Sequence, residues 1–566
     1  MAEASANHSP IHTREIALVL ALLALTVLGA FVGVDGGNMW GVDEWPTSYA
    51  ASRSALSYYV NRPLAILPIY LGYQVAGNAP LPGLAVTLLY RVALALLVYL
   101  LLREYAPRQR LFAYASAAFT LAFLVRDFFL LWAFTLVGNL YGVSVLALLA
   151  LYLQVRHVRS GRLAYLLGGI AVLLVAVLVY EAVVPLLLGV PWLALVLERD
   201  FSRRRLVNAG VWSAAVVAVS AWYALPLLGL REASYGSTLF TGLSPAVLLG
   251  NTITQFRAFE DLPLITVEQL RSFWPALPLG AAVVVAGYLI AARYLPEPAA
   301  EAPVRRRVSQ ALLWLVVGLV TTFLGFAAYL PTLYGALVER IHVTAAPGEG
   351  VLLASLAWLA GSFFPARATR RTARALIFAL IAVVGLYNIN AMQAVNDSYQ
   401  GIWDSDAVFL RGLAHLIPAA EPNTLLVLVV DDPAADPPPF TNGFAFQYAV
   451  RYLYEDSVLA AVTQGGLIAH ELIVDDSGLQ MILAPGFPPA NPMAHPSQHA
   501  WDEVIFLRQD EHGRPVILDT LPEQYAAPGR EALYDPQARI IRSAPLPPRV
   551  LRLLPPLQST TAAPDA

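Results

Sequence analysis

Ionisable side chains gather in three short segments that lie between apolar runs of the sequence. Asp43 and Glu44 are adjacent in the first segment, Arg126 and Asp127 are adjacent in the second, and Glu181 stands in the third. A carboxylate can accept the proton of a hydroxyl nucleophile, and an arginine can hold a phosphate or a carboxylate. Charged groups at the edge of a membrane are costly unless they pair or face a wet cavity, so these residues are the first candidates for a functional site.

The elements that must position these residues are membrane-spanning helices. The chain has 566 residues, of which 58% are hydrophobic and only 13% are charged, and its mean hydropathy is +0.60. A soluble protein carries about a quarter of its residues charged. A spanning helix needs about twenty mainly apolar residues, and on this basis the sequence predicts about eleven helices. The apolar runs are 16–34, 83–102, 111–125, 128–153, 163–180, 182–197, 206–228, 275–293, 311–330, 351–364 and 375–393.

The basic residues predict how these helices are oriented. Arginines follow the second, fourth, sixth, eighth and tenth runs, and the loops between them are not basic. Since positively charged loops stay in the cytoplasm, the N-terminus is predicted to be cytoplasmic and the chain beyond Met392 extracytoplasmic. The sequence therefore predicts a multi-pass protein of the inner (plasma) membrane whose long first loop, 35–82, faces outward.

The chain changes character near residue 395, where Pro and Asp become more frequent and apolar runs shorten. Strands are predicted at 425–430, 458–462 and 504–507, and helices at 406–416 and 446–454. We therefore predict a transmembrane module at 1–394 and an extracytoplasmic soluble α/β domain at 395–566, which ends in a Pro-rich disordered tail. The fold class is a polytopic α-helical membrane protein with a C-terminal α/β domain.

The first outer loop carries a recognisable order of residues. The acidic pair is followed by Arg62-Pro63-Leu64, then by Leu67 and Tyr70 at helical spacing, and the second apolar run ends in Arg103-Glu104. This order resembles the polytopic glycosyltransferases of the GT-C fold that use lipid-linked sugars. Within them it is most similar to the protein O-mannosyltransferases and their bacterial relatives. The likeness covers about the first third of the chain, and the later helices match by topology only.

The resemblance implies a hexosyltransferase that takes its sugar from a polyprenyl-phosphate donor in the membrane and passes it to a glycan or protein acceptor. Asp43 is the first choice for the base that deprotonates the acceptor hydroxyl, and Glu44 is the second. A departing lipid phosphate needs positive charge, which Arg62 or Arg126 would supply. The remaining candidates for substrate binding are Tyr58 and Asn61, which would orient the phosphate, and Asp127 and Glu181. A single carboxylate base without a covalent intermediate implies inversion at the anomeric carbon.

Each of these residues also has a structural interpretation. The acidic pair would simply be solvated, Arg62 would reach the lipid headgroups from a helix start, and Arg126 and Asp127 would neutralise each other in a tight turn. His342, beside Glu339 and Arg340, is a weaker candidate at another outer turn. The alternative function is a transporter or flippase for lipid-linked saccharides, with no transferase activity.

Composition and spacing exclude several other classes. The absence of cysteine excludes thiolate metal sites and a Cys nucleophile, and a net charge of −3 argues against a nucleic-acid partner. Gly465-Gly466 lacks the lysine of a nucleotide-binding loop. No metal site is predicted from spacing, because Asp404-Ser405-Asp406 is typical of a helix N-cap. A divalent metal stays open as a cofactor, which Asp127 would help to hold.

Overall fold

The computed structural model describes residues 12–31, 44–54, 62–76, 80–122, 136–224, 241–257, 276–295, 303–336, 341–430, 443–463, 470–483, 496–527 and 529–554. The chain divides into two compact units. Unit 1 comprises Met1–Gly36, Ala85–Leu131 and Val137–Val395, and unit 2 comprises Gly37–Leu84, Trp132–Leu136 and Asn396–Ala566. Residues of the first loop therefore belong to the same unit as the C-terminal part of the chain, a grouping that the sequence did not indicate.

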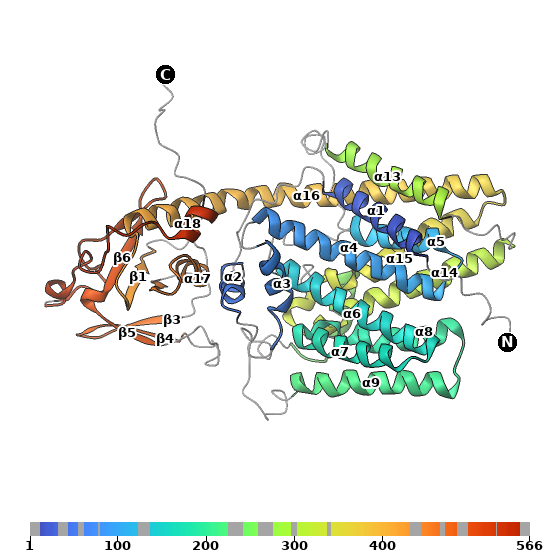
Figure 1. Cartoon of the computed structure of the whole chain (residues 1–566), viewed down its shortest axis with the longest axis horizontal. Coiled ribbons are helices and arrows are strands. Elements are labelled where there is room, and N and C mark those ends of the chain that lie inside the picture. The colour runs from blue at the N-terminus through green and yellow to red at the C-terminus, as the bar shows by residue number, and fades with distance from the viewer. Residues whose placement is uncertain are drawn as a thin grey trace, which may run out of the picture. The chain divides into compact units, whose positions relative to one another are not determined.

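Unit 1 is a bundle of apolar helices, and each of the eleven apolar runs overlaps a described helix (Figure 1). Among the described residues, nine helices are long and apolar enough to cross a membrane. The protein is thus a multi-pass α-helical membrane protein. The helices of the bundle are α1 (Thr13–Ala30), α4 (Pro80–Tyr105), α5 (Arg110–Ala122), α6 (Leu136–Ser160), α7 (Leu163–Val179), α8 (Val184–Glu198), α9 (Arg203–Ala224), α13 (Ala276–Tyr294), α14 (Val304–Phe326), α15 (His342–Ser362) and the first half of α16 (Arg367–Leu416), with α11 (Pro245–Arg257) beside them.

The closest packing in the bundle joins α14 to α15, the most enclosed of the nine candidate spans. Small residues allow it, because helices in lipid associate through close contact of their backbones. A methyl group on Gly318 of α14 would lie 2.5 Å from the backbone nitrogen of Leu352 in α15. Such an approach is impossible for any residue but glycine without a shift of one helix.

Gly318→Ala is therefore expected to lower the stability of the bundle by about 1–3 kcal/mol, as overpacking does elsewhere. A thermal-shift measurement on the purified protein would report this as a lower melting temperature. Gly210→Ala in α9 is the matched control, since its methyl group meets no atom within 4 Å. If both variants melted at the wild-type temperature, the close contact of α14 and α15 would be refuted.

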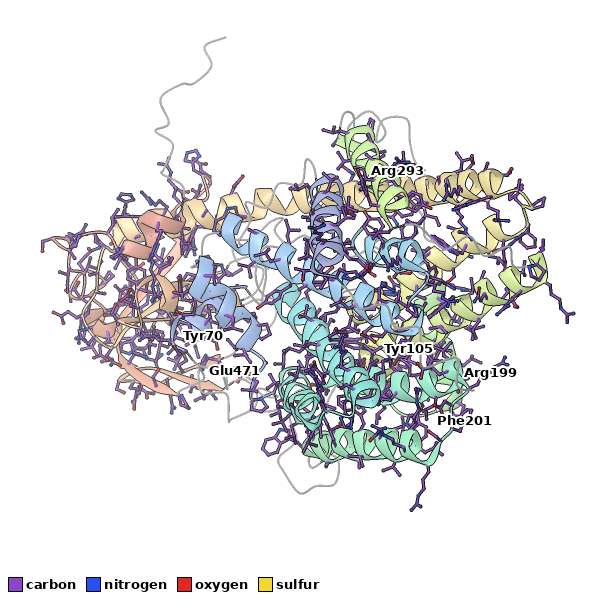
Figure 2. The ribbon with its side chains drawn as sticks, turned by 45° about the vertical axis from the view of Figure 1, so that its right-hand side comes forward. Tyr70, Tyr105, Arg199, Phe201, Arg293 and Glu471 are labelled. Atoms are coloured by element: carbon purple, nitrogen blue, oxygen red, sulfur yellow. The ribbon has the colours of Figure 1, made fainter. Side chains whose placement is uncertain are left out.

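Charged residues from successive predicted cytoplasmic segments meet at one end of unit 1. Glu15 pairs with Arg103 at 2.7 Å, so the start of the chain lies beside the end of α4. A second network joins Arg159 to Glu104 at 3.4 Å and to Glu198 at 2.9 Å. The turn between α8 and α9, which carries Arg199 and Phe201, is labelled in Figure 2. These contacts bring three of the five predicted basic segments together at one end of the bundle.

Unit 2 contains a small α/β fold built on a four-stranded sheet. Its order is β2-β1-β6-β7, in which β1 (Thr424–Leu428) runs parallel to both β2 (Val458–Val462) and β6 (Val504–Gln509), and β7 (Pro515–Ile517) is antiparallel to β6. The helix between β1 and β2 is α17 (Gly443–Leu453). The predicted strands and the helix at 446–454 are confirmed. A separate antiparallel sheet of β3 (His470–Val474), β4 (Gly478–Leu483) and β5 (Ser497–Ala500) was not predicted.

Two further parts of unit 2 differ from expectation or extend it. The predicted N-cap at Asp404-Ser405-Asp406 is wrong, because these residues lie inside α16, a continuous helix of 50 residues. In the Pro-rich tail, α18 (Pro548–Leu553) is helical, and Arg411 donates hydrogen bonds to the carbonyls of Val550 and Leu554 at 3.1 and 3.2 Å. Residues 555–566, where the disordered end is predicted, lie outside the described residues.

His499 on β5 gives unit 2 an expected sensitivity to acid. Its ring is buried, and Nδ1 lies 2.8 Å from the carbonyl oxygen of Asn423 while Nε2 lies 2.7 Å from Oγ of Ser497. Since a carbonyl only accepts, Nδ1 carries the proton and Nε2 accepts from the serine. Burial lowers the pKa of His499 below its ordinary value of 6.5.

The unfolded chain therefore binds a proton at His499 more readily than the folded chain, and the stability of unit 2 is expected to fall as the pH drops below about 6.5. Hydrogen exchange of β5 amides in the full chain at pH 7 and pH 5 would measure this. His499→Gln is expected to lessen the difference between the two pH values. Exchange that is equally slow at both pH values in the wild type would contradict the expected loss of stability in acid.

Candidate active site

The acidic pair of the first loop lies at the start of a short helix. This helix, α2 (Glu44–Ser52), has Glu44 as its first residue, and Asp43 precedes it in the sequence. Pro46 falls in the first turn, where a missing N–H costs nothing. Asp43 and the side chain of Glu44 lie outside the described residues. The backbone of Glu44 is described as the first residue of α2.

Trp45 anchors the first turn of α2. Its side chain is only 1% exposed, and its ring centroid lies 6.2 Å from that of Trp403 on α16 and 6.2 Å from that of Tyr452 on α17. Truncating a buried tryptophan typically costs about 3–5 kcal/mol, so this contact holds the turn firmly. The residue next to the candidate bases is therefore fixed within unit 2.

The opposite end of α2 is also fixed on the C-terminal part of the chain. Tyr49 is 3% exposed, and its ring lies 5.8 Å from that of Tyr448 on α17. Ala50 and Ala51 are buried beside it. The whole apolar side of α2 is thus covered, although α2 and α17 are separated by most of the sequence.

The other predicted site residues are described only in part. Arg62 lies in the turn before α3 (Leu67–Ala76), is partly buried and makes a contact of its own. The remaining candidates from the first two outer segments, namely Tyr58, Asn61, Arg126 and Asp127, lie outside the described residues. Whether they converge on the acidic pair therefore stays a prediction.

Glu181 belongs to unit 1, where it begins the 3₁₀ turn η3 (Glu181–Val183) between α7 and α8. Neighbouring Tyr180 packs against Tyr329, with ring centroids 6.3 Å apart. Ala182 belongs to a buried apolar cluster with Phe326 and Ile341. The turn that carries Glu181 thus lies against the start of α15.

The start of α15 contains a buried polar cluster that sequence reasoning largely missed. His342 is 2% exposed, with Nδ1 at 2.6 Å from Oε1 of Glu349 and Nε2 at 3.0 Å from Oε1 of Gln255 on α11. Glu349 is also 2% exposed. The apolar run at 351–364 begins after Glu349, but α15 begins at His342 and includes this carboxylate. A glutamate two residues before an apolar run was the available signal.

The hydrogen bonds of this cluster fix the number of its protons. Gln255 donates from Nε2 to the carbonyl of Gly335 at 2.9 Å, so its Oε1 accepts a proton from Nε2 of His342. The remaining contact, between Nδ1 of His342 and Oε1 of Glu349, then holds one proton. The pair is either an imidazolium with a carboxylate or a neutral imidazole with a carboxylic acid, and both forms have zero net charge.

Arg91 is a second buried charge that sequence reasoning missed. It is 1% exposed in α4, and its guanidinium carbon lies 4.5 Å from the ring centroids of both Phe31 and Tyr141. Stacking on two aromatic faces is a favourable arrangement for a buried guanidinium. Phe31 directly follows the last residue of α1, so a positive charge lies near the C-terminal end of that helix. A single arginine in the run 83–102 was the available signal.

No group of three or more His, Asp or Glu side chains that could hold a metal ion occurs in the described part of the chain. The described side chains that adjoin the acidic pair in the sequence are those that hold α2. The predicted set of carboxylates and arginines would suit proton transfer and binding of an anion.

The chain matches no protein-family model, and a comparison with curated proteins gives no match either. Among solved structures it is similar to ArnT from Cupriavidus metallidurans bound to undecaprenyl phosphate, with 15% identity and a TM-score of 0.34, over 73% of this chain and 82% of that one. The apo state of the same protein matches with 13% identity and a TM-score of 0.33, over 80% of this chain and 87% of that one.

Proposed function

We propose that this protein is a membrane glycosyltransferase of the GT-C type, which moves a sugar from a polyprenyl-phosphate donor to an acceptor outside the cytoplasm. The observation that carries the proposal is the fixed position of α2. The helix that begins at Glu44 is held at both ends in unit 2, so the element that adjoins the acidic pair in the sequence has a rigid support. Catalytic groups need such support, because small displacements slow a reaction greatly.

In the proposed reaction, Asp43 or Glu44 accepts the proton of the acceptor hydroxyl. The hydroxyl oxygen then forms a bond to the anomeric carbon of the sugar. The bond from that carbon to the phosphate oxygen breaks, and its electron pair leaves with the polyprenyl phosphate. Arg62 or Arg126 stabilises the charge of the departing phosphate. No sugar–enzyme intermediate forms, so the anomeric configuration inverts.

The orientation of the protein follows from its basic segments. They meet at one end of unit 1, and we infer that this end faces the cytoplasm of an inner (plasma) membrane. The N-terminus is then cytoplasmic. The C-terminal domain and the acceptor, a glycan or a protein, lie on the other side.

One observation favours the alternative function, a flippase for lipid-linked saccharides. Ionisable groups inside membrane helices often belong to transport pathways, and His342 and Glu349 form such a buried pair in α15. Their charges cancel within the pair, and Gln255 occupies the other ring nitrogen. These contacts favour a structural role for the pair.

An assay that measures both the release of polyprenyl phosphate and the movement of the donor across the bilayer separates the two functions. Purified protein in liposomes would receive radiolabelled polyprenyl-phosphate sugars of several kinds, together with an envelope fraction as acceptor. A transferase releases polyprenyl phosphate and labels the acceptor. A flippase moves the intact donor to the other leaflet, and no polyprenyl phosphate appears. The second result would refute the proposal.

A further inference from the structure

Two helices of unit 2 end in backbone conformations that are unusual for their residues. After α17, Glu455 and Asp456 have φ values of +53° and +65°, and after α2, Ser54 has a φ of +56°. Glycine adopts this left-handed conformation without strain, and other residues adopt it only where their surroundings enforce it. A side chain at position 456 therefore has a use that glycine would not provide.

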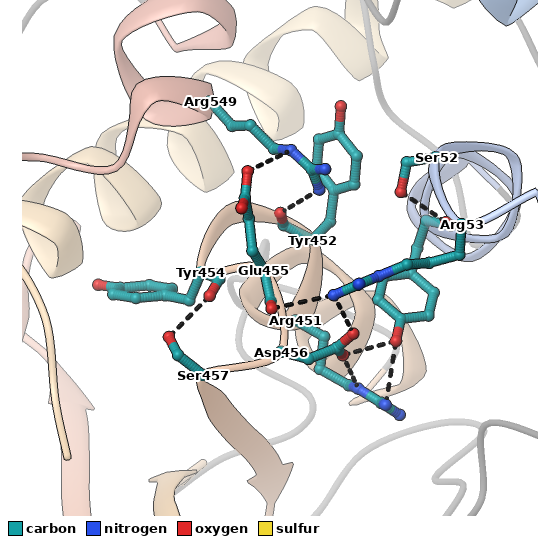
Figure 3. A network of polar contacts seen from close by, with 10 residues as sticks. Ser52, Arg53, Arg451, Tyr452, Tyr454, Glu455, Asp456, Ser457 and Arg549 are labelled. Atoms are coloured by element: carbon teal, nitrogen blue, oxygen red, sulfur yellow. Dashed lines mark hydrogen bonds and ion pairs between the residues drawn. The ribbon is translucent and has the colours of Figure 1, made fainter. Parts of the chain in front are cut away.

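The carboxylate of Asp456 receives three hydrogen-bond donors (Figure 3). Tyr49 donates from its hydroxyl to Oδ1 at 2.5 Å, and Arg451 donates from Nε to the same oxygen at 2.9 Å. Arg53 donates to Oδ2 at 2.5 Å. Two of the three donors belong to α2 or to its last turn, so one side chain ties that end of α2 to α17.

Secondary contacts support this carboxylate from both sides. Arg53 also donates to the backbone carbonyl of Glu455 at 2.9 Å, and Arg451 also donates to the hydroxyl of Tyr49 at 3.1 Å. A single exposed ion pair contributes little, and the side chain of Arg53 is 44% exposed. The strength of the arrangement lies in a carboxylate shared by two cations and a buried hydroxyl, because charge-assisted hydrogen bonds are the stronger kind.

The hydroxyl of Tyr49 keeps its proton over the working range of pH. Burial, followed by the hydrogen bond to Asp456, raises the pKa of Tyr49 to about 12. The hydroxyl therefore stays a donor to the carboxylate, and the contact does not switch at physiological pH.

We propose that Asp456 is a positioning residue for the acidic pair and couples the C-terminal domain to the reaction. This inference rests on the proposed function. Trp45 holds the first turn of α2, and Asp456 holds Tyr49 and Arg53, which lie about 6 and 12 Å further along at 1.5 Å per residue. Without Asp456, α2 loses its charged attachment to α17, and the helix that begins at Glu44 is held by its apolar contacts alone. The chemical step is then slowed while the lipid donor binds as before.

The test compares two neighbouring variants of the full chain. Asp456→Asn keeps the size of the side chain but removes its charge. Asparagine, like aspartate, tolerates the left-handed conformation. Glu455→Gly is the matched control. Glycine adopts the left-handed conformation of residue 455 without strain and keeps the backbone carbonyl that Arg53 contacts. The carboxylate that is removed pairs with Arg549 and not with α2.

The expected result has a physical and a kinetic part. In Asp456→Asn, amide hydrogen exchange of residues 47–52 becomes about tenfold faster, and kcat falls about tenfold with the KM for the lipid donor unchanged. In Glu455→Gly, exchange and kcat match the wild type. A merely structural role would lower the amount of active protein and leave the kcat of the folded fraction intact.

The contrary outcomes are distinguishable. Unchanged exchange of α2 in Asp456→Asn would refute the attachment itself. Faster exchange with an unchanged kcat would refute the positioning role and leave the transferase intact. A wild-type protein that transfers no sugar from any donor would refute the proposed function, whatever the exchange shows.

Discussion

Asp43→Asn is expected, under the proposed function, to lower kcat for sugar transfer by at least about a hundredfold, because the variant loses the proposed acceptor of the hydroxyl proton. The KM for the lipid donor should change little, since the proposal assigns the donor phosphate to Arg62 or Arg126 and not to Asp43. Single-turnover transfer from a radiolabelled donor measures both effects. Glu44→Gln is expected to have the smaller effect.

Asparagine at position 43 separates a catalytic role of Asp43 from a structural one. Asp43 directly precedes α2, and an acid there would also stabilise the start of a helix. Asparagine caps helices about as well as aspartate, so a purely structural role would survive Asp43→Asn. An equal melting temperature with a large loss of kcat separates the two roles. Full activity in Asp43→Asn would move the base to Glu44 or Asp127.

Glu349→Ala is expected to destabilise unit 1 by about 3–5 kcal/mol, because it removes the carboxylate that contacts Nδ1 of the buried His342. Thermal-shift and detergent-denaturation measurements on the purified protein would show this. Glu349→Gln is the matched control, since its amide keeps the shape and donates to Nδ1 of a neutral His342. The alanine variant should therefore melt well below the glutamine variant. Equal melting temperatures would mean that the pair contributes nothing to stability.

A second comparison tests whether the expected loss of stability in Glu349→Ala is due to the burial of the pair. Glu198 also pairs with arginines, but its side chain is 22% exposed at the end of the bundle. Exposed pairs contribute about 0–1 kcal/mol, so Glu198→Ala should cost far less than Glu349→Ala. A larger loss at Glu198 would contradict this account of the buried pair.

Apolar runs and strand patterns predicted most of the fold, because both depend on local sequence. Each run became a helix, and β1, β2 and β6 lie where alternation and apolar runs placed them. The continuity of α16 was missed. Asp404 and Asp406 suggested a new helix start, yet no proline occurs between Pro365 and Pro418 to end the first one. The N-cap pattern is also compatible with a helix interior.

The candidate site was only partly predictable for a different reason. The acidic pair and Arg62 are close in sequence, so their types and order could be recognised together. Asp456 contacts Tyr49 across 407 positions of sequence, and Gln255 contacts His342 across 87. Such partners depend on the tertiary fold, and a single sequence contains no local signal for them. Two left-handed residues in succession are likewise visible only in the structure.

The most direct test of the central claim is the release of polyprenyl phosphate from a polyprenyl-phosphate sugar by purified protein in liposomes, with the double variant Asp43→Asn/Glu44→Gln beside the wild type. The account predicts release and acceptor labelling by the wild type and neither by the double variant, at equal folded amounts of both proteins. Equal release by the two proteins, or movement of intact donor across the bilayer without any release, would contradict it.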